Sequence, residues 1–108
     1  MRSGTPVVNA YLARMSETEL QNKIIDWATL NGWLHYHTHD SRRSPSGFPD
    51  LVLVRAPEII YAELKAEGKY ATPRQRVWIA SLKASGQEVY LWRPRDWPEI
   101  ENRLRRRR

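Results

Sequence analysis

The chain has 108 residues, 41% of them hydrophobic and 28% charged, which fits one compact domain and excludes both two independent domains and wholesale disorder. It contains no cysteine, so disulfides, thiol nucleophiles and thiolate metal sites are excluded. The formal net charge of +6 favours a polyanionic partner. Because five positive charges are arginines at positions 103 and 105–108, a protein with a merely arginine-rich end is the alternative.

The first residues differ from the rest in showing no clear apolar period, and Met15 is followed at once by a strong helix start. We therefore expect a poorly ordered extension over residues 1–15, one domain over 16–104 and a basic tail over 105–108. No apolar run approaches the roughly 20 residues of a membrane-spanning helix. The segment from Pro6 to Leu12 is too short and too polar for a secretion signal. We expect a cytoplasmic protein.

A helix is predicted over residues 16–31. Ser16 and Glu19 form a capping-box pattern, apolar residues then recur at helical spacing, and Gly32 ends the helix. The period next changes to two, which predicts a strand over residues 33–39. The loop after this strand is rich in turn formers and carries two adjacent arginines.

Two further strands are predicted over residues 50–54 and 59–65, joined by a short connection through Ala56 and Pro57. Apolar residues occupy both faces of these two strands. We therefore expect both faces of the sheet to be covered at this point.

Two acids of this hairpin are brought together by its register. If Val54 faces Ile59, then Asp50 faces Glu63, and Lys65 lies on the same face two residues further on. Facing Cβ atoms lie about 5 Å apart, so the two carboxylates can share one cation with oxygen ligands. The alternative is a pair of ordinary strand-end acids, neutralised by Lys65 or a loop arginine. Acids at the end of a doubly covered strand are costly unless compensated, which favours the cation site.

The second half of the chain completes the element order. Thr72 is an N-cap with Pro73 at the first helical position, and Gly86 ends the helix that they begin. Residues 88–92 predict a fourth strand, and a last short helix begins near Asp96. The order is α-β-β-β-α-β-α, which predicts an α/β fold.

The residues around the two acids resemble a known family. Pro49-Asp50, a hydrophobic strand and then Glu63-Leu64-Lys65 are similar to the signature of the PD-(D/E)XK nuclease superfamily. A longer set resembles the stand-alone, phage-type VRR-NUC domains, and it comprises Gly47 to Val54, Ala62 to Lys65, Gly68 with Lys69, Thr72 and Pro73 with Gln75 and Trp78, and Glu88 to Pro94. The resemblance spans residues 16–104 and implies a restriction-endonuclease-like α-β-β-β-α-β core, with a central mixed sheet flanked by helices.

The resemblance also implies a metal-dependent endonuclease that hydrolyses phosphodiester bonds of DNA. In that pattern Asp50, Glu63 and the backbone carbonyl of Leu64 hold Mg²⁺ or Mn²⁺. Lys65 orients the attacking water, and Glu17 contributes a further acid directly or through water.

The family pattern includes an acid on the first helix, and two glutamates compete for that role. At about 100° per residue, Glu17 lies in line with Gln21 and Ile24 on the predicted buried stripe. Glu19 points nearly the opposite way and already has a capping role. We therefore assign the site role to Glu17, with Gln21 one turn below it as a supporting residue.

Gln75 shares the inward face of the second helix with Trp78, Ile79 and Leu82. An inward polar group must find partners, either on the backbone at the helix start or at the site. The resemblance favours a catalytic supporting role for Gln75 beside the metal.

Three histidines, at positions 35, 37 and 39, alternate along the first strand as ligands of a zinc site would. A zinc site needs three or four ligands with supporting partners, so we expect the histidines to line a polar groove instead. We assign phosphate contacts to His37, Arg42, Arg43 and Lys69, with solvated surface charge as the alternative for each.

The expected function is that of an endonuclease specific for branched DNA, such as four-way (Holliday) junctions, working as a homodimer in a bacterial or phage-infected cell. Two rivals stay open. One is a catalytically inactive DNA-binding module of the same fold. The other is a nuclease that acts on linear DNA or on RNA, including a zinc-dependent one.

Overall fold

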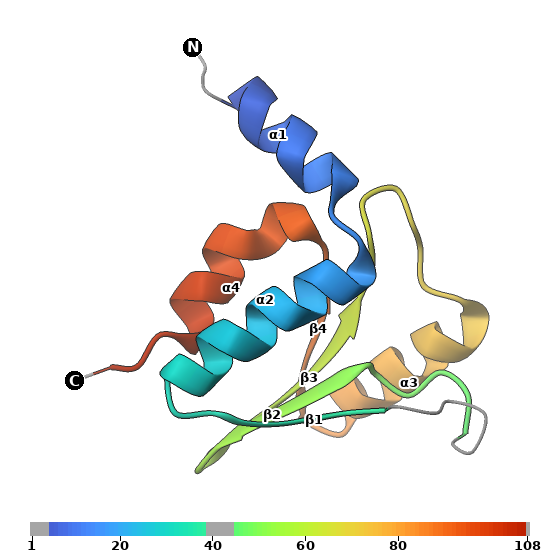
Figure 1. The fold of residues 1–108 in the computed structure, drawn as a ribbon. Helices are drawn as coiled ribbons and strands as arrows, with labels where there is room; N and C mark the ends of the chain where they lie inside the picture. The colour runs from blue at the N-terminus through green and yellow to red at the C-terminus, as the bar shows by residue number, and fades with distance from the viewer. Residues whose placement is uncertain (1–4, 39–44, 108) are drawn as a thin grey trace.

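The computed structural model describes residues 5–38 and 45–107, and these form a four-stranded mixed sheet with helices on both faces (Figure 1). The strands are β1 (Leu34–His37), β2 (Leu51–Arg55), β3 (Glu58–Leu64) and β4 (Glu88–Trp92), and they lie in that order. The pairs β1–β2 and β2–β3 are antiparallel, whereas β3 and β4 are parallel. The chain between β3 and β4 is therefore a crossover, and it carries helix α3 (Pro73–Ala84). The predicted α/β class with a central mixed sheet is confirmed.

Helix α2 (Glu17–Leu30) follows the capping box that the sequence predicted. The Ser16 hydroxyl accepts a hydrogen bond from the Glu19 backbone N–H, and the Glu19 carboxylate accepts one from the Ser16 N–H. The buried residues of α2 are Leu20, Ile24 and Ala28, which recur every four residues along one side. That side packs on the sheet. This packing fixes the position of the first turn of α2, which extends beyond the sheet.

The hydrophobic core lies between the sheet, α2 and α4 (Trp97–Leu104), which follows a short 3₁₀ turn, η2 (Pro94–Asp96). Its largest fully buried apolar side chains are Trp92, Leu20, Ile24, Leu51, Leu53, Ile60, Leu64, Ile100 and Leu104. Burial of each such side chain contributes roughly 1.5–3 kcal/mol. This well-packed face is the rigid support for the ends of β2 and β3.

The opposite face of the sheet is covered only in part. Tyr61 points to that face and meets Phe48, whose ring in turn meets Trp78 of α3. None of the twelve residues of α3 is buried, and Val54 and Ile59 are left half-buried and exposed, respectively. The expectation that both faces of the central strands are covered is therefore wrong for this face. A helix of twelve residues such as α3 covers only part of a twisted sheet of four strands (Figure 1).

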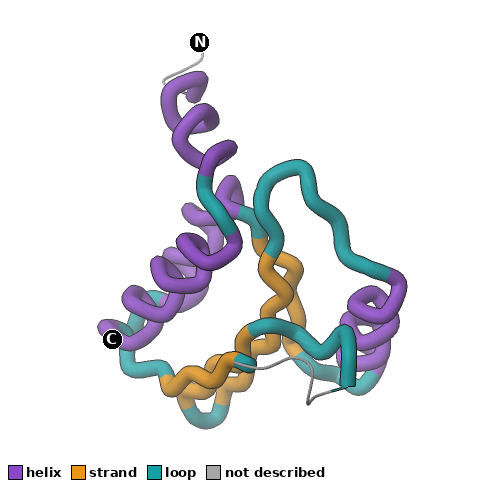
Figure 2. Tube along the Cα trace, turned by 45° about the vertical axis from the view of Figure 1, so that its right-hand side comes forward, coloured by secondary structure: helices purple, strands orange, loops and turns teal. Residues whose placement is uncertain are grey.

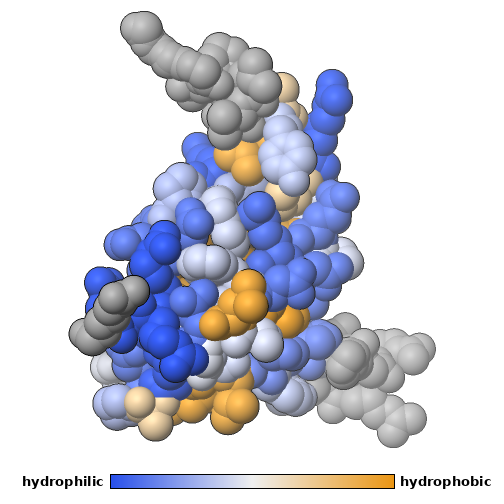
Figure 3. Space-filling model, turned by 60° about the vertical axis from the view of Figure 1, so that its left-hand side comes forward, coloured by the Kyte–Doolittle hydropathy of each residue, from blue (hydrophilic) through white to orange (hydrophobic). Residues whose placement is uncertain are grey.

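The C-terminal arginines gather at the end of α2 that lies away from Glu17. The guanidinium of Arg103 donates to Glu88 and Glu58, and the Arg106 backbone N–H donates to the side chain of Asn31, the C-cap of α2. Figure 3 shows a strongly hydrophilic area beside this end of the chain. At 1.5 Å per residue, the length of α2 separates these charges from its first turn by roughly 20 Å. The charge of Arg103 is therefore balanced by acids of the sheet.

Helix α1 (Thr5–Arg14) was not predicted, because its residues show no clear apolar period. It projects away from the rest of the molecule (Figure 1). Across the described ranges, no helix has the length and apolar character that crossing a membrane requires.

Candidate metal and active site

The β2–β3 hairpin has the register that the sequence predicted. Val54 pairs with Ile59, and the ladder runs on to Leu51 and Ala62. Asp50 and Glu63 occupy the next positions. Asp50 lies just before β2, where one of its carboxylate oxygens accepts a hydrogen bond of 3.0 Å from the Leu64 backbone N–H. This bond ties Asp50 to the end of β3 and fixes its carboxylate beside Glu63.

Glu63 is a buried carboxylate, with a side chain 1% exposed. Neither of its carboxylate oxygens has a hydrogen-bond partner among the described residues, and the nearest cation is Lys65, whose Nζ lies 3.7 Å from one oxygen. Burial, followed by the charge of Asp50, raises the pKa of Glu63 to about 8, and Lys65 acts in the opposite direction. The Asp50 carboxyl, which can share a proton with Glu63, and then the charge of Glu17 add smaller increases. The site is therefore short of positive charge.

A cavity of about 170 Å³ lies at this point, lined by Glu17, Thr18, Gln21, Asp50 and Leu64. It has room for several water molecules, each of which takes about 30 Å³ in the liquid. Residues from the first turns of α2 thus face the start of β2 and the end of β3.

The two glutamates of the first turn of α2 point in different directions, as the helical spacing predicted. Glu17 lines the Asp50 cavity, whereas Glu19 is held in the capping box and lines a different cavity, beside α1. The expectation that Glu17 is buried is wrong. As the first residue of α2, it lies beyond the packed stripe, where solvent reaches it.

The donor atoms fit an oxygen-liganded divalent cation. Two carboxylates lie together, and one of them is buried without a hydrogen-bond partner in the described part of the chain, an arrangement that a cation would neutralise. Within residues 5–38 and 45–107, no three side chains of His, Cys, Asp or Glu lie close enough to hold a metal ion. Asp50 and Glu63 would therefore need the Leu64 carbonyl and water to complete the ligand set, with Glu17 acting through water.

The loop before Asp50 is anchored to α3, a connection that sequence reasoning missed. The Trp78 indole N–H donates to the Ser46 carbonyl at 3.2 Å, and Arg74 donates to the Ser46 hydroxyl at 3.2 Å. Gly47 has a φ of +95°, and a Cβ at this position would lie 2.7 Å from the Arg74 backbone. Only glycine fits this close approach. The glycine of the Gly47-Phe48-Pro49-Asp50 string was the available signal.

Gln75 is engaged in capping α3. Its side-chain oxygen accepts a hydrogen bond of 2.8 Å from the Thr72 backbone N–H, and the Thr72 hydroxyl accepts one from the Gln75 N–H. Gln75 does not line the Asp50 cavity. The structure therefore shows the backbone-bonding arrangement that was the alternative to a role at the site.

The residues predicted to contact phosphate are only partly described. His37 pairs with Leu51 and so lies at the end of the sheet where Asp50 is found, with its ring stacked 6.2 Å from that of His35. Lys69 is exposed, and its carbonyl accepts hydrogen bonds from Arg93. Arg42, Arg43 and the third histidine, His39, lie outside the described residues.

Comparisons with known proteins agree with this fold. A solved structure described as a VRR_NUC domain protein is 22% identical, with a TM-score of 0.58 over 71% of this chain and 76% of that chain. The structure of Archaeoglobus fulgidus Hjc, a Holliday junction resolvase from an archaeal hyperthermophile, is 17% identical, with a TM-score of 0.51 over 67% of this chain and 62% of that chain. No protein with a curated description matches the sequence.

The sequence itself gives the decisive comparison. The model of the VRR-NUC domain matches residues 4–96, a range that takes in α1 and stops before α4. The division into an extension over 1–15, a domain over 16–104 and a tail over 105–108 stays a prediction. At the level of the family, these findings support a nuclease. The chain belongs to the VRR-NUC domain family.

Proposed function

We propose that this protein is a metal-dependent endonuclease that hydrolyses phosphodiester bonds of DNA at the site formed by Asp50, Glu63 and Lys65. The observation that carries the proposal is the buried Glu63 carboxylate, which has no hydrogen-bond partner among the described residues and lies beside a second carboxylate. Such a pair destabilises the fold unless a cation or a proton neutralises it. A site of this kind in a PD-(D/E)XK nuclease uses Mg²⁺ or Mn²⁺.

Each residue has a distinct role in this proposal. Asp50, Glu63 and the Leu64 carbonyl hold the cation. When bound, the cation offsets phosphate charge and acidifies a water molecule. Lys65 places its ammonium beside Glu63, from where it donates to the phosphate or orients the attacking water. Glu17 and Gln21 hold water in the adjoining cavity. A catalytic role for Gln75 stays a prediction.

An inactive DNA-binding module is the rival function. A module that only binds DNA would gain from replacing Glu63 with a neutral residue, because a carboxylate next to a polyanion weakens binding. The retention of two acids at the centre of the site favours catalysis.

We propose that the substrate is branched DNA. We also propose that the protein is a phage-type member of the family and acts in the cytoplasm of a bacterial or phage-infected cell. The fold is shared with an archaeal Holliday junction resolvase, which supports this choice. His37, Arg42, Arg43 and Lys69 would contact the backbone on either side of the cut.

The test compares labelled single-stranded, duplex, flap and four-way DNA in the presence of Mg²⁺, Mn²⁺, Ca²⁺ or EDTA. We expect cleavage with Mg²⁺ or Mn²⁺, strongest on a branched substrate, and none with Ca²⁺ or EDTA. Cleavage that persists in EDTA would contradict the metal site. Equal rates on linear and branched DNA would contradict only the substrate.

The two glutamates at the start of α2 provide a matched pair of variants. Glu17→Gln is expected to slow cleavage by roughly 10- to 100-fold, the usual effect of losing a group that supports metal ligands. Glu19→Gln should be nearly silent, since glutamine also completes a capping box. Single-turnover rates measure both. The reverse ranking would remove Glu17 from the site.

The uncovered part of the sheet supports a homodimer. Leu34 pairs with Val54, and Val54 with Ile59, so their side chains form one row on the face away from the core. Leu34 is 73% exposed, and Tyr36 in the next row is also exposed. Exposed apolar rows of this kind are typical of interfaces. We propose that two copies pack here and so hold two sites at a fixed separation.

Leu34→Glu tests this interface. A two-fold interface contains the substitution twice, so we expect the dimer dissociation constant to rise at least about 10-fold, as measured by light scattering. The control is Leu30→Glu on α2, because Leu30 is 76% exposed but lies on a different element. A wild-type protein that is monomeric at working concentrations, or equal effects of both variants, would contradict the interface.

A further inference from the structure

A second concave surface lies between α3 and β4, with a volume of about 540 Å³, within the range of ligand sites. We call it the α3–β4 groove. Its walls are apolar, with Ile79 of α3 on one side and Leu91 of β4 on the other. Its charged residues are Arg76, Lys83 and Arg93, and no acid is among the described residues that line it.

The groove adjoins the proposed active site through the sheet. Leu91 is the register partner of Glu63 in the parallel β3–β4 pair, and register partners point to the same face. Neighbouring strands are about 4.8 Å apart, so the floor of the groove lies one strand away from the buried carboxylate. The connection from β3 to α3 begins at Lys65 and forms a long loop that leads to the start of α3 (Figure 2). A strand whose phosphate lies at Lys65 can therefore continue into the groove.

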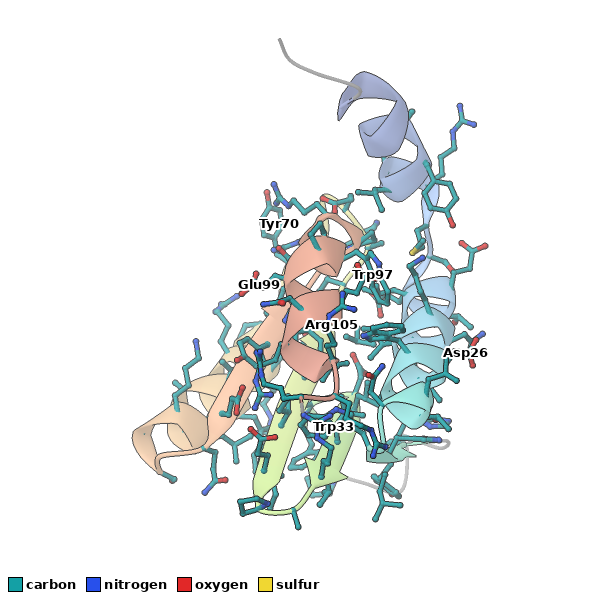
Figure 4. All side chains as sticks on the ribbon, turned by 90° about the vertical axis from the view of Figure 1, so that its left-hand side faces the viewer. Asp26, Trp33, Tyr70, Trp97, Glu99 and Arg105 are labelled. Atoms are coloured by element: carbon teal, nitrogen blue, oxygen red, sulfur yellow. The ribbon has the colours of Figure 1, made fainter. Side chains whose placement is uncertain are left out.

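Tyr70, on that connection, supplies an aromatic surface. Its side chain is 78% exposed and lies at the periphery of the molecule (Figure 4). The Arg93 guanidinium lies 5.5 Å from the centre of the Tyr70 ring and donates hydrogen bonds to the Lys69 carbonyl. These contacts hold the ring at the mouth of the groove. The Tyr70 ring is thus left largely in solvent beside Arg93, where a ligand can stack on it.

The chemistry of the groove distinguishes an unpaired strand from a duplex. A duplex presents phosphates and keeps its bases stacked inside, so it has no use for apolar walls or an exposed ring. An unpaired nucleotide presents both, because its base stacks on aromatic and apolar side chains while its phosphates meet cations. We propose that the α3–β4 groove binds an unpaired DNA strand next to the cleavage site, with a base stacked on Tyr70 and phosphates at Arg76, Lys83 and Arg93. This inference rests on the proposed nuclease function and narrows its substrate to DNA with an unpaired segment.

The test is binding of the full chain to fluorescent single-stranded and duplex DNA of equal length, in Ca²⁺ so that no cleavage occurs. Base stacking on an aromatic side chain is worth about 1–3 kcal/mol. We therefore expect Tyr70→Ala to weaken single-strand binding by roughly 5- to 150-fold and to leave duplex binding within about 2-fold. Lys83→Ala should also weaken single-strand binding and flatten its salt dependence.

Tyr11→Ala is the matched control, because Tyr11 is an exposed tyrosine on α1, outside the groove. It should leave both affinities unchanged. Equal losses on single-stranded and duplex DNA, or no loss with Tyr70→Ala in a protein with wild-type circular dichroism, would overturn the groove assignment. Cleavage of flap DNA by the wild type, measured separately with Mg²⁺, keeps the two ideas apart. If the wild type cleaves DNA but Tyr70→Ala binds single strands normally, only the groove assignment is contradicted. If the wild type cleaves none of the substrates, the proposed nuclease function is contradicted.

Discussion

Asp50→Asn and Glu63→Gln are each expected to lower the rate of DNA cleavage by more than about 100-fold, while DNA binding in Ca²⁺-free buffer stays intact or becomes tighter. Each substitution removes a proposed metal ligand, and replacing even a group that supports such a ligand typically costs 10- to 100-fold. Each also removes a negative charge near the phosphate, which favours binding of the polyanion. Single-turnover cleavage and fluorescence anisotropy measure the two effects on the same preparation.

Asp26→Asn and Glu99→Gln are the matched controls. Both are exposed acids on helices, and neither lines the Asp50 cavity. They should cleave at the wild-type rate. A further arm uses Lys65→Ala, which should cleave poorly yet still bind Mn²⁺, because Lys65 is not assigned to coordination. Full activity of Asp50→Asn or Glu63→Gln would place the site elsewhere on the molecule.

Much of this site could be predicted from the sequence, because short-range sequence patterns determine it. The hairpin register follows from the short connection at Ala56 and Pro57, and it brought the positions of Asp50 and Glu63 together without knowledge of the fold. The start of α2 follows from the capping box at Ser16, which in turn sets the direction of Glu17. Each of these features depends on residues close in sequence.

Features that depend on distant residues were missed. The docking of Ser46 and Gly47 on α3 joins segments about thirty residues apart, and no local pattern encodes it. The incomplete burial of Val54 and Ile59 on the second face depends on how much of the sheet α3 covers. Apolar residues at alternating positions predict a strand with two apolar faces, but they do not tell which face a partner covers.

The second large effect concerns the stability of the metal-free protein. Glu63 has an ordinary pKa of 4.5 when exposed, and burial raises it to about 8 in the folded state. Between these pH values the folded protein holds a proton that the unfolded chain releases. Stability from this group is therefore complete below about pH 4.5 and is lost as the pH rises through 8. Glu88, whose pKa is lowered mainly by its hydrogen bonds to Arg103, contributes stability that is lost only below pH 4.5, outside this window.

Urea unfolding in EDTA at pH 5, 7 and 9 should therefore show the wild type losing a few kcal/mol across this range, since each pKa unit corresponds to about 1.4 kcal/mol. Glu63→Gln should be nearly insensitive to pH and more stable than the wild type at pH 9, because its amide carries no charge to bury. Glu99→Gln should keep the wild-type slope.

A cation in this site must compete with that proton, so its effect on stability should depend on pH in the opposite direction. At a free concentration of 100 times its dissociation constant, Mg²⁺ adds about 2.7 kcal/mol to the free energy of unfolding. We expect Mg²⁺ to stabilise the wild type strongly at pH 9 and weakly at pH 5, where Glu63 is protonated and its oxygens are poor ligands. Glu63→Gln should gain little at either pH. If the stability of the wild type depends on neither pH nor Mg²⁺, then Glu63 carries no unfavourable buried charge and is not a ligand of the cation. Stabilisation of Glu63→Gln equal to that of the wild type would place the cation at a different group.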